Sequence, residues 1–141
     1  MMTVMSMVLS DLKNMKTDKI LKMSLIHDWA ESKIGDFMPN EITHEKKTEL
    51  EEYAMIEILE VLPVKLKEDY YSLWDEYKEN SSIEARFVHE LDKLEMVIQA
   101  KLYQKNGIDK EKIRPFIESA SNDIKTDNMK KILKKFIEET Q

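Results

Sequence analysis

The stretch that decides the fold is Ser82 to Gln104, SIEARFVHELDKLEMVIQAKLYQ, which contains neither glycine nor proline. Apolar residues recur in it at spacings of four, three, four and four, so they share one helical face. Ser81 followed three residues later by Glu84 forms a capping box at its start, and Asn106-Gly107 ends it. The pattern predicts one long helix whose core stripe is Phe87, Leu91, Leu94, Ile98 and Leu102.

The rest of the chain carries the same signature. Its 141 residues include two glycines and three prolines, whereas the helix formers Leu, Ile, Met, Lys and Glu are plentiful. This composition predicts an all-α helical bundle of about six to seven helices, forming one domain over residues 1–141. Besides the long helix and an N-terminal helix, we expect helices over 18–33, 45–62, 66–78, 110–121 and 127–139, the last two within the C-terminal part 106–141.

Charge and cysteine usage exclude several classes of function. The chain has 28 acidic and 22 basic residues, a formal net charge of −6 and a pI near 5.2. This balance argues against nucleic acid or an anionic membrane surface as a partner. Because there is no cysteine, we expect neither disulfides nor thiol chemistry, which suits a cytoplasmic protein.

The apolar run at residues 1–12 is too short to span a bilayer as a helix. It also lacks the basic segment that precedes the apolar part of a signal peptide, so we expect no membrane or targeting role for it. No capping residue and no acidic first turn come before the run. It has the character of the second half of a buried helix, and we therefore expect further residues upstream of Met1.

Chemistry concentrates at His27-Asp28, within Leu-Ile-His-Asp-Trp-Ala-Glu at 25–31. Burying charged groups without a partner costs several kcal/mol, so this cluster requires a compensating cation. Glu31 lies four residues after His27 and three after Asp28, on the same side of a helix. Asp92 lies at the edge of the long helix's core stripe and also requires a cationic partner. A mixed nitrogen and oxygen donor set suits Mn, Fe, Co, Zn or Mg, although a hydrogen-bonded core histidine explains His27 as well.

Several motifs together resemble one family, the HD-domain metal-dependent phosphohydrolases, and within it the 5′-deoxynucleotidase-like branch. The resemblance spans about residues 1–103. Its motifs are Met-Ser-Leu-Ile-His-Asp-Trp-Ala-Glu at 23–31, Gly35-Asp36, Glu-Tyr-Ala at 52–54, Leu-Trp-Asp-Glu-Tyr at 73–77 and Glu-Ala-Arg-Phe-Val-His-Glu-Leu-Asp-Lys-Leu-Glu-Met at 84–96.

The resemblance implies one divalent metal ion held by His27, Asp28 and Asp92. A fourth ligand, a histidine, would align just before Met1. It further implies hydrolysis of the 5′-phosphate of (deoxy)nucleoside monophosphates by a metal-bound water. Glu31 and Asp36 are the catalytic candidates that would position this water or pass a proton to the leaving nucleoside. Homodimerisation is also implied.

Other interpretations of these residues remain open. Glu31 can instead accept a hydrogen bond that fixes the His27 ring, and Asp36 can be a turn residue beside Gly35. We expect His89 at the surface or next to the metal ligands. The aromatic residues Tyr70, Trp74 and Tyr77 suit a packing face or a dimer contact, and the lysines within 130–135 suit a solvated face. A catalytically inactive nucleotide-binding, regulatory or dimerisation module is the alternative to an enzyme.

Overall fold

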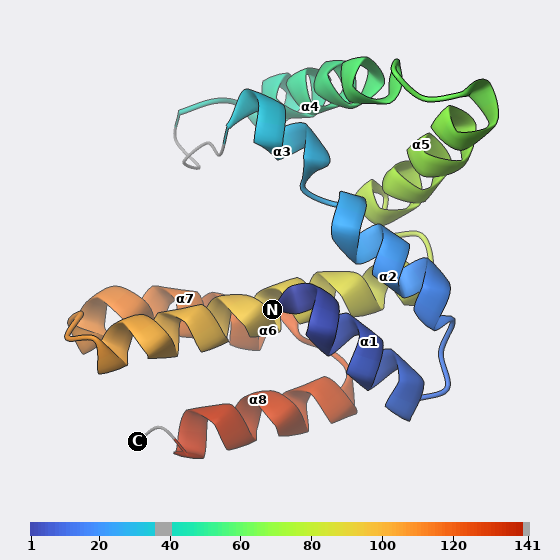
Figure 1. The fold of residues 1–141 in the computed structure, drawn as a ribbon. Coiled ribbons are helices and arrows are strands. Elements are labelled where there is room, and N and C mark those ends of the chain that lie inside the picture. The colour runs from blue at the N-terminus through green and yellow to red at the C-terminus, as the bar shows by residue number, and fades with distance from the viewer. Residues whose placement is uncertain (36–40, 140–141) are drawn as a thin grey trace.

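The structure is a computed structural model that describes residues 1–35 and 41–139. The described residues form helices without strands, which confirms the all-α prediction (Figure 1). The helices are α1 (Met2–Leu12), α2 (Thr17–Ile26), α3 (Trp29–Ile34), α4 (His44–Leu59), α5 (Val64–Lys78), α6 (Ile83–Lys105), α7 (Lys110–Asp123) and α8 (Asp127–Glu139).

The helices form two packed groups that diverge from a common side of the molecule. In Figure 1, α3 and α4 lie at the top and α6, α7 and α8 lie below, with α2 and α5 running between the two groups. The larger apolar cluster is built mainly from α2, α6, α7 and α8 and includes Ile20, Leu91 and Met129. The smaller cluster includes Ile26, Met55 and Trp74. Leu73 packs against both clusters.

The long central helix is where the periodicity predicted it. Ser82, rather than Ser81, caps α6 through a 3.0 Å hydrogen bond that its hydroxyl accepts from the Ala85 amide. Phe87, Leu91 and Leu94 of the predicted stripe are buried, whereas Leu102 is 43% exposed. The prediction was wrong for Leu102 because the buried face at this point of α6 runs through Ala100 and Lys101, which are 6% and 7% exposed.

The single helix expected over 18–33 is two helices, and this break raises the helix count above the expected six to seven. α2 ends at Ile26 and α3 begins at Trp29. The His27 ring Nδ1 lies 2.7 Å from the Ser24 carbonyl oxygen, which would accept from the Asp28 amide in an unbroken helix. Asp28 instead has φ −101° and ψ 7°. The imidazole thus donates to a main-chain carbonyl directly before the turn at His27-Asp28.

The N-terminal helix α1 packs on α2 with its small side chains inward, contrary to the expected buried apolar helix. Ser6 and Ser10 are fully buried, while Val4 and Leu12 are 60% and 74% exposed. The Ser6 hydroxyl donates to the Met2 carbonyl at 2.9 Å, so its burial leaves no unpaired donor. The inner face of α1 thus combines these serines, which allow close approach between helices, with Met2, Met5 and Leu9, which pack on the larger cluster.

A buried carboxylate holds the turn between α7 and α8. Glu90 of α6 is 6% exposed, and its Oε1 accepts from the Lys125 and Thr126 amides at 2.8 and 3.0 Å. Its Oε2 accepts from the Thr126 hydroxyl at 2.6 Å. Glu90 therefore fixes the start of α8 to the central helix.

Within the described part of the chain, no helix is both long and apolar enough to cross a membrane.

Candidate metal centre

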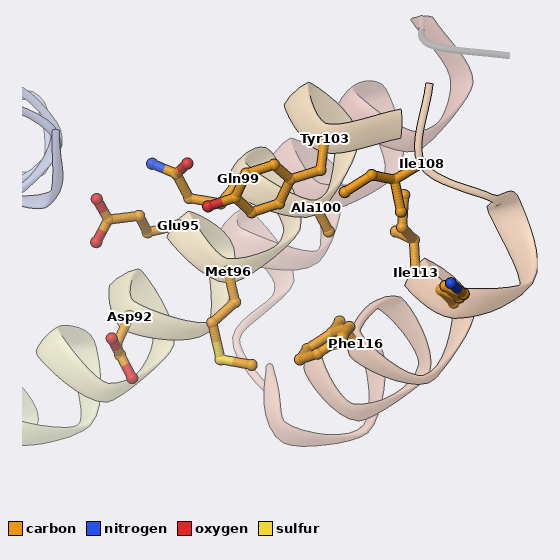
Figure 2. Close-up of a pocket in the computed structure, with 10 residues that line it drawn as sticks. Asp92, Glu95, Met96, Gln99, Ala100, Tyr103, Ile108, Ile113 and Phe116 are labelled. Carbon is orange, nitrogen blue, oxygen red and sulfur yellow. The ribbon is translucent and has the colours of Figure 1, made fainter. Parts of the chain in front are cut away.

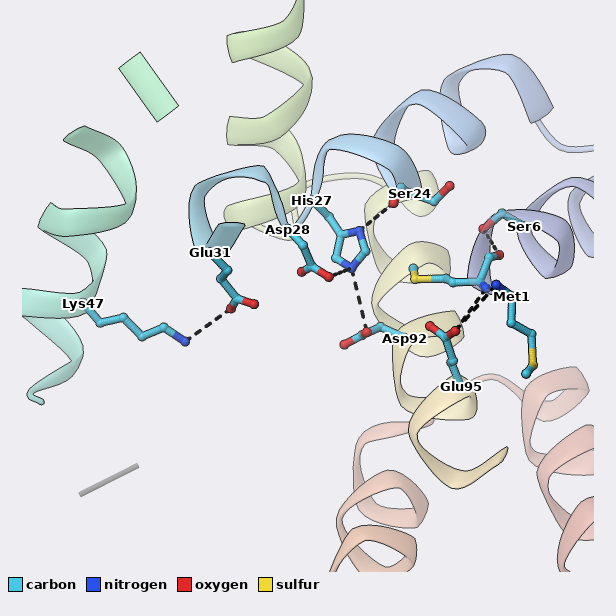
Figure 3. A network of polar contacts seen from close by, with 10 residues as sticks. Met1, Ser6, Ser24, His27, Asp28, Glu31, Lys47, Asp92 and Glu95 are labelled. Carbon is cyan, nitrogen blue, oxygen red and sulfur yellow. Dashed lines mark hydrogen bonds and ion pairs between the residues drawn. The ribbon is translucent and has the colours of Figure 1, made fainter. Parts of the chain in front are cut away.

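The structure brings together the three predicted metal ligands from two parts of the chain that lie far apart in sequence. His27 and Asp28 occupy the break between α2 and α3, and Asp92 lies on α6 (Figure 3). The His27 Nε2 atom is 3.0 Å from Asp28 Oδ2 and 3.8 Å from Asp92 Oδ1. The His27 side chain is 8% exposed, whereas those of Asp28 and Asp92 are 62% and 36% exposed. The imidazole is thus the buried member of the group, and the carboxylates open toward solvent.

Hydrogen bonding determines which ring nitrogen of His27 can serve as a metal ligand. A carbonyl oxygen only accepts, so the Ser24 carbonyl requires the hydrogen on His27 Nδ1. In the neutral imidazole the lone pair is therefore on Nε2. This buried atom makes no hydrogen bond of acceptable geometry within the described residues, although carboxylate oxygens lie beside it. A lone pair facing two carboxylates needs a proton or another cation between them.

The donor atoms suit a divalent cation but do not complete its coordination. Two ligands each about 2.1 Å from one ion are separated by roughly 3.0 Å at a right angle and about 4.2 Å when opposite. The His27 Nε2 distances to Asp28 and Asp92, 3.0 and 3.8 Å, fall in that range. Among the described residues, however, no group of three or more His, Cys, Asp or Glu side chains is arranged to hold a metal ion. A bound ion would therefore need further ligands or a rearrangement of these side chains.

Charge governs the protonation of His27. Burial lowers the pKa of the imidazole, but the neighbouring Asp28 and Asp92 carboxylates, together with the Ser24 carbonyl, outweigh burial and raise the pKa to about 10. A metal ion must displace this proton, so we expect metal affinity to rise with pH.

The raised pKa predicts how the stability of the metal-free protein depends on pH. Because the pKa rises from 6.5 in the unfolded chain to about 10 in the folded protein, the protonated ring stabilises the fold fully below pH 6.5. This contribution is lost as the pH rises from 6.5 through 10. Urea unfolding with a chelator at pH 6 and pH 10 measures it. The His27→Ala protein should lack this particular loss, and equal losses in both proteins would contradict the assignment.

Of the two catalytic candidates, the structure describes Glu31 but not Asp36. Glu31 lies on α3, where its Oε1 is 3.5 Å from Lys47 Nζ, and Lys47 is equally close to Glu51. Glu31 is not the residue that fixes His27, since the Ser24 carbonyl does so. Asp36 lies outside the described residues.

His27, Asp28, Glu31 and Asp92 line one cavity of about 470 Å³ between the two helix groups. The volume is within the usual range for small-molecule sites. Carboxylates dominate its polar lining, which is formed by His27, Asp28, Ala30, Glu31, Glu51, Trp74, Tyr77, Lys78, Asp92 and Met96. The cavity joins α3, α4, α5 and α6 around the break in the chain.

Tyr77 was expected in a packing face or dimer contact, but it lines this cavity. Burial raises the pKa of its hydroxyl, and the nearby Asp92 and Asp28 carboxylates raise that pKa further. His89, expected at the surface or near the ligands, is half-buried and stacks on the Tyr77 ring. The helical spacing of Tyr70, Trp74 and Tyr77 correctly predicted that Tyr77 packs. Spacing alone does not predict that the same ring also lines a cavity.

A second, apolar groove of about 370 Å³ adjoins the cavity and shares Asp92 and Met96 with it. In Figure 2, Met96 of α6 and Phe116 of α7 extend toward each other across this groove. Tyr103 and Phe116 are 55% and 51% exposed. The other lining residues are Glu95, Gln99, Ala100, Ile108, Lys112 and Ile113.

Comparisons with known proteins agree with this geometry. The family profile described as "HD domain" matches residues 1–134. The human protein named 5'-deoxynucleotidase HDDC2 is 42% identical over 104 residues, which cover 73% of this chain and 50% of the relative. The Xenopus laevis protein of the same name is 34% identical over 139 residues, covering 98% of this chain and 69% of the relative.

A solved structure shares the arrangement of helices. It is the HD domain-containing protein YGK1, whose Saccharomyces cerevisiae namesake is called a 5'-deoxynucleotidase. The TM-score is 0.76 at 27% sequence identity, and the alignment covers 99% of this chain and 72% of the other. The chain spans about half the length of the human relative.

Proposed function

The chain belongs to the HD domain family, and we propose that it works as a metal-dependent phosphohydrolase that removes the 5′-phosphate of (deoxy)nucleoside monophosphates. The observation that carries this proposal is the buried His27 Nε2 atom beside the carboxylates of Asp28 and Asp92. Such an arrangement suits a divalent cation, which a phosphohydrolase uses to activate water and bind phosphate.

His27, Asp28 and Asp92 would hold the ion, and the mixed nitrogen and oxygen donors suit Co, Mn, Mg, Fe or Zn. When bound, the ion supplies Lewis acidity toward the phosphate oxygens and lowers the pKa of a coordinated water. The Ser24 carbonyl keeps the Nδ1 hydrogen of His27 in place, so that Nε2 remains available as a ligand.

Glu31 and Asp36 are proposed as the carboxylates that orient water or move a proton to the departing nucleoside. Glu31 supports this role by lining the same cavity as the three metal ligands. The Glu31 carboxylate also pairs with Lys47, whose Nζ lies 3.5 Å from Glu31 Oε1.

The adjoining apolar groove suits the nucleoside part of the substrate. It begins at Asp92 and Met96, which also line the polar cavity, and it continues to the exposed rings of Tyr103 and Phe116. Aromatic and aliphatic side chains bind the faces of nucleobases without discriminating strongly among them. A phosphate in the polar cavity and a base in the groove would use both spaces at once.

We further propose that the protein forms a homodimer and acts in the cytoplasm. An apolar strip on the outer side of α1 supports self-association, since Val4, Val8 and Leu12 are 60%, 46% and 74% exposed. The absence of cysteine suits a reducing compartment.

The decisive test is phosphate release from a panel of nucleoside and deoxynucleoside monophosphates with Co, Mn or Mg. We expect release that requires the metal and stops on addition of a chelator, because the imidazole and carboxylates bind phosphate only through a cation. Nucleoside triphosphates serve as the comparison substrates. Metal and nucleotide binding without any phosphate release would instead support the inactive binding module.

A further inference from the structure

The ring of Tyr77 contacts two histidines, His27 at the break between α2 and α3 and His89 of α6. Its edge meets the His27 ring, with centroids 5.4 Å apart and an interplanar angle of 68°. Its face stacks on the His89 ring at 4.0 Å and 7°. The residue at the end of α5 therefore contacts both the metal-binding imidazole and the central helix α6.

His89 also binds the main chain of Tyr77. Its Nε2 atom lies 2.7 Å from the Tyr77 carbonyl oxygen, which only accepts, so the ring donates this hydrogen bond. Tyr77 is in the last turn of α5, where carbonyl groups lack partners within the helix. One imidazole thus fixes the backbone and the ring of Tyr77 together, which sets the direction of its side chain.

The Tyr77 hydroxyl is a neutral donor in a cavity lined mostly by acceptors. Tyr77 lines the cavity together with Asp28, Glu31, Glu51 and Asp92, and within the described residues its hydroxyl donates no recorded hydrogen bond to any of them. A phosphate monoester brings further negative charge, so it needs donors as well as a cation.

The lysine that lines the same cavity is already engaged. Lys78 Nζ lies 2.8 Å from Glu52 Oε1 and 3.7 Å from Asp75 Oδ1, and it also sits 4.9 Å from the centre of the Trp74 ring. Redirecting Lys78 to a ligand would break these contacts, whereas the Tyr77 hydroxyl can donate without breaking any recorded bond.

We propose that the Tyr77 hydroxyl donates a hydrogen bond to a phosphoryl oxygen of the substrate, beside the metal ligand His27. This inference rests on the proposed phosphohydrolase function, which it deepens by assigning a phosphate-binding residue. Tyr77 keeps its proton throughout, so it forms and breaks no covalent bond. His89 is the positioning residue, because it touches Tyr77 and does not line the cavity.

The Tyr77→Phe substitution tests the hydroxyl alone, since phenylalanine retains the ring that packs between the two histidines. We expect kcat/KM for deoxynucleoside monophosphates to fall about 10- to 100-fold, the usual effect of one hydrogen bond to a charged group. Metal content and thermal unfolding should match the unsubstituted protein. Tyr70→Phe is the matched control, because Tyr70 is on the same helix but packs on Trp29 outside the cavity.

Binding of inorganic phosphate to the metal-loaded protein, measured by calorimetry, separates this inference from the proposed function. Weaker phosphate binding by Tyr77→Phe, with or without turnover in the parent protein, supports the inference. If the parent releases phosphate and the variant equals it in kcat/KM and binding, the inference is wrong and the function stands. If the parent neither binds nor releases phosphate, both are overturned.

A double-mutant cycle tests the positioning role of His89. His89→Ala removes the stacking partner of the Tyr77 ring and one of the two donors to its carbonyl, so it should also weaken phosphate binding. In the Tyr77→Phe background the same substitution should cause no further weakening, because the donor is already absent. Additive losses would show that His89 acts through something other than Tyr77.

Discussion

The His27→Ala protein is expected to remain helical and to lose its divalent metal. His27 is the buried member of the ligand group and the only one that supplies nitrogen among the three residues assigned to the ion. Loss of residues that merely orient ligands commonly lowers metal affinity about 10- to 100-fold, and loss of the ligand itself should exceed this range. Phosphate release should fall to the background rate for the same reason.

Elemental analysis after dialysis measures the metal directly, without depending on turnover. The His44→Ala protein is the matched control, since His44 is exposed at the start of α4. Stoichiometric metal in dialysed His27→Ala would refute the ligand assignment. Circular dichroism establishes that the variant remains folded, which separates loss of the ligand from loss of the structure.

Glu90→Ala, away from the metal centre, should lower the free energy of unfolding by about 3 kcal/mol. The substitution removes the acceptor for two main-chain amides and one hydroxyl at the turn between α7 and α8. Hydrogen bonds to charged groups contribute about 1.5–3 kcal/mol each, but water will reach part of this turn once the carboxylate is gone. Urea unfolding of the metal-free protein measures the difference.

Glu90→Gln provides a graded comparison, because the amide retains one acceptor oxygen in nearly the same shape. It should lose about half as much stability as Glu90→Ala. Glu138→Ala is the surface control, since its pairing with Lys134 is exposed and worth at most about 0.5 kcal/mol. A Glu90→Ala protein as stable as this control would show that the turn does not depend on the carboxylate.

The amphipathic helices were predictable from sequence because their apolar spacing alone determines which side faces the core. The prediction succeeded for α6 and also for the end of α3, where Gly35 has φ 82°. It failed between α2 and α3, since apolar periodicity continues through His27 and Asp28. The break depends on a ring-to-carbonyl hydrogen bond that residue spacing does not reveal.

The residues of the candidate site were likewise predictable only in part. The resemblance to a family placed His27, Asp28 and Asp92 together although Asp92 is far away in sequence, and the structure brings them into contact. Tyr77 was not predicted as a residue of the site, because an aromatic residue at helical spacing normally indicates packing. Its ring does pack, and the same side chain reaches the cavity.

The two apolar clusters meet along α2 just before the break at His27-Asp28, since Ile20 and Met23 belong to one cluster and Ile26 to the other. Because α3 and α4 pack in the smaller cluster, which Leu73 joins to the larger one, we expect the α3–α4 side to open before the protein unfolds globally. An ion shared by His27, Asp28 and Asp92 would fasten that side to α6 and oppose such opening in proportion to its occupancy. The supply of metal would then determine how often the α3–α4 side opens. The same ion would thus serve the chemistry and set how long the cavity stays closed.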